Sequence, residues 1–191
     1  MIINPKNTNI SYCNMPKFIE FVQPVRPRDW IVGIDGGLKQ SAYVVYDNIN
    51  QLIIEKAIVP NKMLLNLIWG ERIDGDYFVI EEIQGYGNAV GNTIFDTVKW
   101  NGRFIEALDQ TDKKWFEIKR TKVKSILCHN AHAKDSNVRT EIINRMGDYK
   151  FGKTGKGTKK NPGKLYGVSK DMFAALAIAI AWGELKEENL Q

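Results

Sequence analysis

The stretch WIVGIDGGLKQSAYVVYD (residues 30–47) places an aspartate and two glycines between two apolar segments rich in β-branched and aromatic residues. Such segments are typical of buried strands. One interpretation is an ordinary turn, because Asp-Gly is a common hairpin signal and a turn aspartate needs no chemical role. The other is that Asp35 ends the first strand as a functional carboxylate. The rest of the chain decides between them.

The composition is that of one globular domain. The chain has 191 residues, of which 43% are hydrophobic and 26% charged, and its net charge is +5. Cys13 and Cys128 suggest no disulfide framework, so a reducing compartment is expected. No signal segment opens the chain, and the longest apolar run, 174–182, is too short to span a bilayer. We therefore expect a cytoplasmic protein with no membrane partner.

The order of the predicted elements indicates an α/β fold. Residues 1–29 are predicted to be an N-terminal extension, and residues 30–191 to form the single domain. Strands are expected at 30–35, 41–47, 51–59, 76–83 and 114–118, and helices at 60–69, 91–109, 121–127, 134–146 and 168–185. The first three strands can form an antiparallel meander, and the later ones can add in parallel. The expected architecture is a mixed five-stranded sheet flanked by helices.

Carboxylates fall on three different elements of this fold. Asp35 ends the first strand, Glu81 and Glu82 lie in the fourth, and Asp171 lies at the start of an otherwise apolar, alanine-rich final helix. Taken singly, each has an ordinary explanation, such as a helix N-terminal aspartate favoured by the helix dipole. If the first and fourth strands pair in parallel, however, Asp35 and one glutamate converge at one sheet edge. Crowded carboxylates repel each other, and a divalent cation relieves that repulsion.

Three of these segments resemble the RuvC family of Holliday-junction resolvases, within the RNase H-like superfamily, and the resemblance spans residues 30–184. IVGIDGGLKQSAYVVYD is similar to the family's first strand, Gly-Ile-Asp-Pro-Gly, with Gly36 in place of the proline. YFVIEEIQ is similar to the strand that ends in Glu-Gln, and KDMFAALAIAIAW to the closing helix. Two further segments, 87–104 and 157–176, resemble phage-encoded members, for which the compartment would be the cytoplasm of the bacterial host.

The resemblance implies an RNase H-like fold and a metal-dependent nuclease. Asp35, Glu81 and Asp171 are implied as catalytic residues and ligands of Mg²⁺, with Mn²⁺ able to substitute. The closing helix of the family carries a second aspartate, but this chain has Ala174 at that position. The second metal is then either held more weakly or held by another residue.

Basic positions of the family are matched only in part. In TKVKSILCHNAHAKDSNVRTEIINRM (121–146), Lys124 matches a basic position implicated in substrate handling and is taken here as catalytic. The second basic position falls on Asp135, with Lys134 beside it. Asp135 is also the competitor of Asp171 for the role of third metal ligand.

A lysine-rich loop precedes the final helix. It can be a solvated loop or a surface that contacts DNA phosphates, and we favour the second interpretation. The predicted DNA-binding residues are Lys134, Lys150, Lys153, Lys156, Lys159, Lys160 and Lys164.

Two motifs in the chain are discounted. GDYKFGKT (147–154) satisfies the phosphate-loop pattern, but a helix precedes it where a strand is required, so no nucleotide cofactor is expected. Cys128, His129 and His132 lack a fourth zinc ligand, and helix-cap or surface histidines are the simpler account.

The sequence thus predicts a metal-dependent endonuclease that nicks Holliday junctions or other branched DNA as a homodimer, since symmetric cuts require two sites related by a two-fold axis. Two alternatives remain open: a general flap or fork nuclease with the same centre, and a non-catalytic DNA-binding module, which the missing acid at Ala174 suggests.

Overall fold

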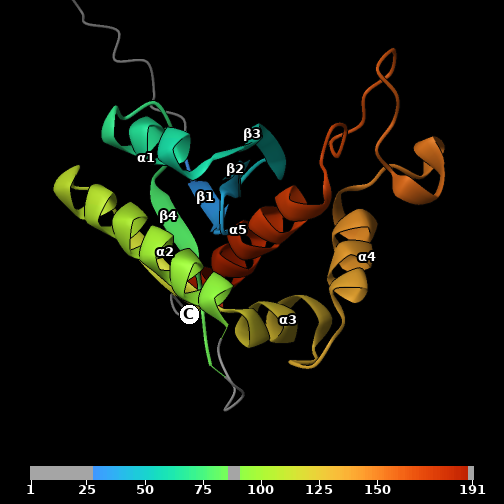
Figure 1. Cartoon of the computed structure of the whole chain (residues 1–191). Coiled ribbons are helices and arrows are strands. Elements are labelled where there is room, and N and C mark those ends of the chain that lie inside the picture. Colours follow the sequence, from blue (N-terminus) through green and yellow to red (C-terminus); the bar gives the residue numbers. More distant parts are fainter. Residues whose placement is uncertain (1–27, 86–90, 189–191) are drawn as a thin grey trace, which may run out of the picture.

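The computed structural model describes residues 28–85 and 91–188 (Figure 1). The predicted extension, apart from Arg28 and Asp29, lies outside these residues. The elements follow the predicted order: β1 (Trp30–Asp35), β2 (Gln40–Asp47), β3 (Leu52–Pro60), α1 (Asn61–Trp69), β4 (Tyr77–Glu82), α2 (Asn92–Gln110), β5 (Trp115–Lys119), α3 (Arg120–Cys128), α4 (Asp135–Met146), the 3₁₀ helix η1 (Tyr149–Thr154) and α5 (Lys170–Glu188).

The strands form the predicted mixed sheet, in the order β3-β2-β1-β4-β5. β1 pairs antiparallel with β2 and parallel with β4, and β4 pairs parallel with β5. The register between β1 and β4 sets Ile34 beside Ile80, so Asp35 and Glu81 are the next residues along two adjacent strands. The parallel pairing on which the sequence argument depended is therefore confirmed.

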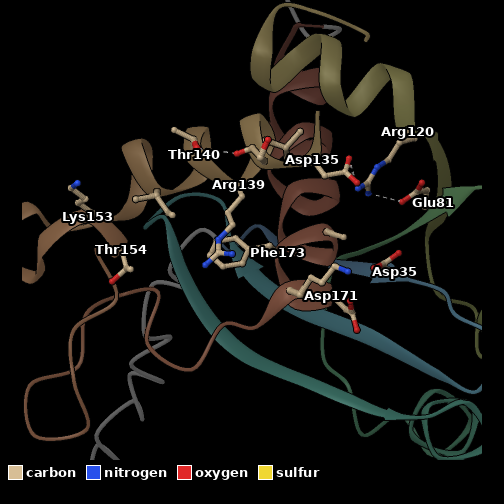
Figure 2. A pocket seen from close by; sticks show the side chains of 15 residues that line it. Asp35, Glu81, Arg120, Asp135, Arg139, Thr140, Lys153, Thr154, Asp171 and Phe173 are labelled. Carbon is tan, nitrogen blue, oxygen red and sulfur yellow. Dashed lines mark hydrogen bonds and ion pairs between the residues drawn. The ribbon is translucent and has the colours of Figure 1, made fainter. Parts of the chain in front are cut away.

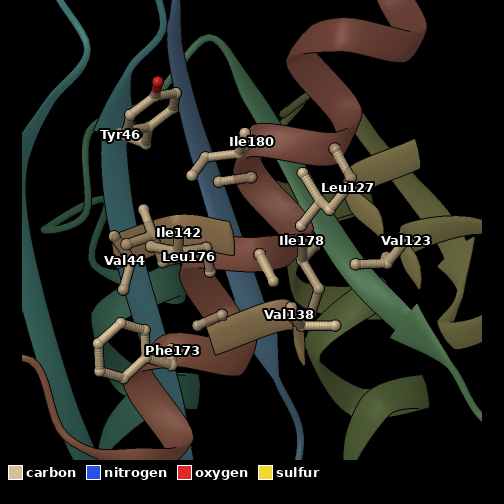
Figure 3. Packing of buried hydrophobic residues seen from close by; sticks show 14 of the residues in the cluster. Val44, Tyr46, Val123, Leu127, Val138, Ile142, Phe173, Leu176, Ile178 and Ile180 are labelled. Atoms are coloured by element: carbon tan, nitrogen blue, oxygen red, sulfur yellow. The ribbon is translucent and has the colours of Figure 1, made fainter. Parts of the chain in front are cut away.

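Both faces of the sheet are covered, which explains why β1 is apolar on both sides. Val32 and Ile34 pack with Leu64 of α1 and Phe104 of α2 on one face. On the other face α5 lies against the sheet, and α3 and α4 pack beside it (Figure 1). Figure 3 shows that second core, in which Leu176, Ile178 and Ile180 of α5 lie among the following residues of β2, α3 and α4: Val44, Tyr46, Val123, Leu127, Val138 and Ile142.

The helix α5 crosses β1 at backbone contact. A Cβ atom on Gly33 would lie 2.0 Å from the carbonyl oxygen of Ala175 and 3.0 Å from the amide nitrogen of Ala179. The small side chains of the final helix therefore let its backbone approach the sheet closely. This contact sets how closely the first turn of α5, which carries Asp171, lies to the end of β1.

The largest departure from the predicted elements lies before α5. The helix begins at Lys170, two residues later than expected, and continues to Glu188. The expected loop at 147–167 contains η1, and Gly152, Gly155, Gly157 and Gly167 within it adopt positive φ angles. Glycines free to adopt that conformation let the segment fold back on itself, so it is more structured than its composition suggested.

Among the described residues, the helices are all too short or too polar to cross a membrane.

Gly33→Ala is expected to lower the free energy of unfolding by roughly 1–3 kcal/mol, because the added methyl group overlaps the Ala175 backbone and neither partner can move without separating α5 from the sheet. Gly102→Ala is the matched control, since a Cβ on Gly102 of α2 meets nothing within 4 Å. That control should stabilise by up to about 1 kcal/mol through helix propensity. Urea denaturation followed by circular dichroism measures both; equal effects would show that the contact is not tight.

Candidate active site

Acidic side chains from four elements line one pocket of about 680 Å³ at the ends of β1 and β4 (Figure 2). Asp35 comes from β1, Glu81 from β4, Asp135 from α4 and Asp171 from α5. The pocket is completed by Arg120, Ser136, Val138, Arg139, Thr140, Ile143, Lys153, Thr154, Lys170, Phe173 and Ala174. The structure therefore places in one pocket the three carboxylates that the sequence predicted, together with Asp135, the competitor of Asp171.

The turn that follows Asp35 is fixed by hydrogen bonds to two buried side chains. The amide of Gly37 donates to Ser41 Oγ at 3.2 Å, and Ser41 Oγ donates to Asn61 Oδ1 at 2.8 Å. The side-chain amide of Asn61, at the start of α1, donates to the carbonyl oxygen of Gly37 at 2.8 Å. Ser41 and Asn61 are both about 1% exposed. The glycines after Asp35 thus belong to an anchored turn that holds the end of β1 in place.

Asn101 of α2 explains why residue 36 is glycine. A Cβ atom at that position would lie 2.0 Å from Asn101 Oδ1. The amide of the same side chain donates to the carbonyl oxygen of Glu81 at 3.1 Å. One buried side chain therefore packs against the residue after Asp35 and binds the backbone of Glu81, which sets the two strand ends relative to each other.

The two adjacent glutamates of β4 have different surroundings. Glu81 lines the pocket, its side chain is 15% exposed, and its Oε2 accepts a hydrogen bond from Arg120 Nη1 at 3.0 Å. Glu82 accepts from Gln84 Nε2 at 3.1 Å and does not line the pocket. Of the two alternatives, Glu81 is therefore the one that meets Asp35.

Asp135 differs from the other acids because it is held by two cations. Its Oδ1 lies 3.0 Å from Arg120 Nη2 and 3.1 Å from Lys124 Nζ, while its side chain remains 69% exposed. Lys124, predicted to be catalytic, is therefore tied to a pocket residue but does not itself line the pocket.

The electrostatics of the site are those of crowded carboxylates. Burial, then the charge of Glu81 and that of Asp171, raises the pKa of Asp35 to about 7, although Arg120 opposes the shift. Burial also raises the pKa of Glu81, again against the effect of Arg120. Burial acts on Asp135 in the same direction, but hydrogen bonds from Arg120 and Lys124 outweigh it, and the pKa of Asp135 is lowered.

The oxygen atoms gathered at this site have the chemistry that a divalent cation requires of its ligands. They belong to carboxylates that repel one another, and Asn101 Oδ1, an oxygen buried without a hydrogen-bond partner, lies at the same strand ends. Mg²⁺ prefers oxygen ligands of this kind. Across 28–85 and 91–188, however, no three acidic, histidine or cysteine side chains are gathered closely enough to hold one ion in this arrangement. The guanidinium of Arg120 is the positive charge that Glu81 contacts here.

The predicted DNA-binding lysines have varied surroundings. Lys153 lines the pocket, whereas the ammonium of Lys156 donates to the carbonyl oxygen of Val168 and lies 4.9 Å from the centre of the Phe173 ring. Lys150 forms an ion pair with Asp148 at 2.7 Å, and Lys164 donates to the carbonyl oxygen of Gln51 at 3.3 Å. The remaining three, Lys134, Lys159 and Lys160, are exposed and lie outside the pocket lining.

Sequence reasoning missed three cations of the pocket: Arg120, Arg139 and Lys170. Helical spacing was the available signal for the first two. Arg139 follows Asp135 by four residues and Arg120 precedes Lys124 by four, so each pair shares one helix face. The guanidinium of Arg139 lies 5.0 Å from the centre of the Phe173 ring.

The two discounted motifs have the following surroundings, and Lys153 and Thr154, which belong to the first, line the pocket. The phosphate-loop pattern lies on η1, which follows helix α4 and not a strand. Cys128 ends α3 half-buried, and His129 is its C-cap in the left-handed conformation, with a φ angle of 52°.

The arrangement of the sheet and its helices is similar to the fold of known Holliday junction resolvases. Two structures of RuvC from Thermus thermophilus match. One has TM-score 0.56 and 15% identity over 83% of this chain and 96% of that one; the other, in complex with a Holliday junction substrate, has 0.62 and 16% over 84% and 96%. The yeast mitochondrial Holliday junction resolvase Ydc2 matches with TM-score 0.56 and 12% identity, over 87% of this chain and 82% of that one.

No protein-family model matches the sequence, and no curated protein sequence matches it. The fold likeness is thus carried by structure at low sequence identity.

Asp35→Asn is expected to stabilise the metal-free protein at pH 8 by roughly 1–4 kcal/mol. The folded protein keeps the Asp35 proton up to about pH 7, whereas the unfolded chain releases it near the ordinary pKa of 3.8. Wild-type stability should therefore fall between those two pH values and stay low above them, and the variant should lack that part of the pH dependence. Urea denaturation from pH 4 to 8 in EDTA measures it.

Glu117→Gln, a change at an exposed position of β5, is the control and should leave the pH profile unchanged. An Asp35→Asn variant that is less stable than wild type at pH 8 would contradict the repulsive cluster.

Proposed function

We propose that this protein is a metal-dependent, structure-selective endodeoxyribonuclease that nicks Holliday junctions or other branched DNA. The observation that carries the proposal is the pocket that joins four carboxylates to cationic side chains of α4, η1 and α5. Such a pocket offers a phosphodiester both a metal centre and positive charge. The RuvC-like fold supports the choice of substrate, since one of the matching structures holds a Holliday junction.

The residues that would hold Mg²⁺, or Mn²⁺ in its place, are Asp35, Glu81 and Asp171. When bound, the metal would neutralise the scissile phosphate and activate a water for in-line attack. Ala174 lines the pocket one turn after Asp171, so a fourth acid is missing there, and Asp135 is the other carboxylate within the pocket. A second ion would therefore be held more weakly than the first.

The protein's own cations would act on the substrate. Arg139, Lys153 and Lys170 line the pocket and would orient the DNA backbone by binding phosphate oxygens. Lys124, which lies outside the pocket lining and is held by Asp135, would add positive charge beside the pocket and so favour the negative charge that develops on the phosphate during cleavage. The exposed lysines 159 and 160 would extend the phosphate contacts beyond the pocket.

The proposed oligomer is a homodimer, formed through the outer face of α1 and α2. These two helices expose large apolar side chains: Met63, Trp69, Ile94, Phe95 and Val98. Phe95 alone is 54% exposed, as expected of a side chain buried only on association. A second copy placed there would supply the second site that paired cuts in a junction require.

Asp35→Asn, Glu81→Gln and Asp171→Asn are each expected to reduce nicking of a synthetic four-way junction by at least about a thousandfold while junction binding is retained. Each change removes a proposed metal ligand but leaves the cationic residues in place. Glu82→Gln is the matched control, because Glu82 neighbours Glu81 but lies outside the pocket. The same assay with flaps, forks and linear duplex separates a junction nuclease from a general branched-DNA nuclease.

The metal comparison belongs to the same assay. Mn²⁺ should support faster cleavage than Mg²⁺ because it tolerates a less regular ligand set, and Ala174→Asp should narrow the difference. Binding without any metal-dependent cleavage would favour the non-catalytic module instead.

Replacing the exposed Lys159 and Lys160 by alanine is expected to weaken binding to DNA of every shape. Each lost phosphate contact should lower the slope of log affinity against log salt by about 0.9. Lys113→Ala is the control, because Lys113 forms an ion pair with Glu71 away from the pocket. Fluorescence anisotropy over a series of salt concentrations gives the slope. An unchanged slope would show that these lysines do not contact DNA phosphates and that the loop is an ordinary solvated surface.

A further inference from the structure

One guanidinium in the pocket bridges two carboxylates that come from different elements. Arg120, the first residue of α3, donates from Nη1 to Glu81 Oε2 at 3.0 Å and from Nη2 to Asp135 Oδ1 at 3.0 Å. Its side chain is 24% exposed, so the bridge is partly shielded from water. Figure 2 shows Arg120 between the two acids, with Asp35 beside Glu81.

We propose that Arg120 is a positioning residue that neutralises Glu81 until a divalent cation binds, and that it then keeps only its contact with Asp135. The inference rests on the proposed metal centre at Asp35, Glu81 and Asp171. It adds a competitor for that centre, built into the protein, which the proposed function does not require.

Competition follows from charge and from the geometry of the bridge. A divalent cation at Glu81 would meet a guanidinium already bound to one oxygen of that carboxylate, and two cations at one carboxylate repel. Binding of the metal must therefore displace Arg120 from Glu81 or work against its charge. The cost of displacement is small for the arginine, because its second N–H edge stays paired with Asp135.

Asp135 is suited to be the residue that retains Arg120. Its side chain is 69% exposed and is also paired with Lys124, so a shift of the guanidinium toward it does not bury an uncompensated charge. The N–H edge released from Glu81 belongs to a residue that lines the pocket, where a substrate phosphate would provide a new acceptor. Metal binding would thereby prepare Arg120 for the DNA backbone.

A purely structural bridge makes a different prediction. If Arg120 only ties α3 and α4 to β4, removal of either end of the bridge should loosen the pocket and weaken metal binding in both cases. If Arg120 competes with the metal, removal of Arg120 and removal of the Asp135 charge have opposite effects on the metal affinity. Loss of the guanidinium frees Glu81, whereas loss of the Asp135 charge leaves Glu81 as the main partner of Arg120.

The test measures Ca²⁺ binding to the full chain by isothermal titration calorimetry at pH 7.5, without DNA. Arg120→Gln should bind Ca²⁺ about tenfold more tightly than wild type, and Asp135→Asn about threefold more weakly. The double variant should match Arg120→Gln, because Asp135 acts on the metal only through Arg120. Glu81→Gln should lose binding, which ties the signal to this centre. Urea denaturation checks that each variant folds.

Arg120→Lys serves if the glutamine variant does not fold. Its single ammonium cannot span both acids as the guanidinium does, so the affinity for Ca²⁺ should still exceed that of wild type.

Ca²⁺ affinity that is unchanged or lower in the folded arginine variants would overturn the proposal while leaving the metal centre intact. A double variant weaker than Arg120→Gln would also overturn it, since Asp135 would then be a ligand. If wild type and every variant fail to bind Ca²⁺, Mg²⁺ or Mn²⁺, the proposed metal dependence itself is wrong and the competition with it.

Discussion

Because a helix can approach a strand at backbone contact only where side chains are absent or small, α5 crosses β1 where Gly33 meets Ala175. The rest of the site depends on that contact. It places the first turn of α5 above the end of β1, and the parallel register of β1 with β4 then adds Glu81. Asp35, Glu81 and Asp171, far apart in the chain, thus share one pocket because two strands in fixed register and one closely packed helix carry them.

The same contact gathers carboxylates at the ends of β1 and β4, where burial makes a negative charge unfavourable. The pKa of Asp35 is raised to about 7, first by burial and then by its acidic neighbours. Ionised Asp35 therefore lowers the stability of the folded state, and a bound cation would remove that free-energy cost. At Glu81, the positive charge of Arg120 offsets part of the cost of burying a carboxylate. Unfavourable clusters of this kind gather at functional sites, and that is the physical reason to regard this edge of the sheet as the candidate active site.

The sheet and its acids were predictable because they depend on short-range patterns. Apolar runs located the strands, and the parallel pairing of β1 with β4, which the sequence argument took as its condition, brings Asp35 to Glu81. The bridge from Arg120 to Asp135 was not predictable, since it depends on the angle between α3 and α4, which periodicity does not encode. The surroundings of Lys156 were missed for a related reason: positive-φ glycines fold its loop against Phe173, where composition suggested only solvent.

The contact between Gly36 and Asn101 constrains how this sequence can evolve. A side chain at position 36 would collide with the Asn101 carboxamide, which also binds the backbone of Glu81. The two positions are therefore coupled: a side chain at 36 requires the Asn101 carboxamide to move or residue 101 to become smaller, and either change gives up the hydrogen bond to Glu81. Substitutions at positions 36 and 101 are thus expected to have non-additive effects on the geometry of the two strand ends.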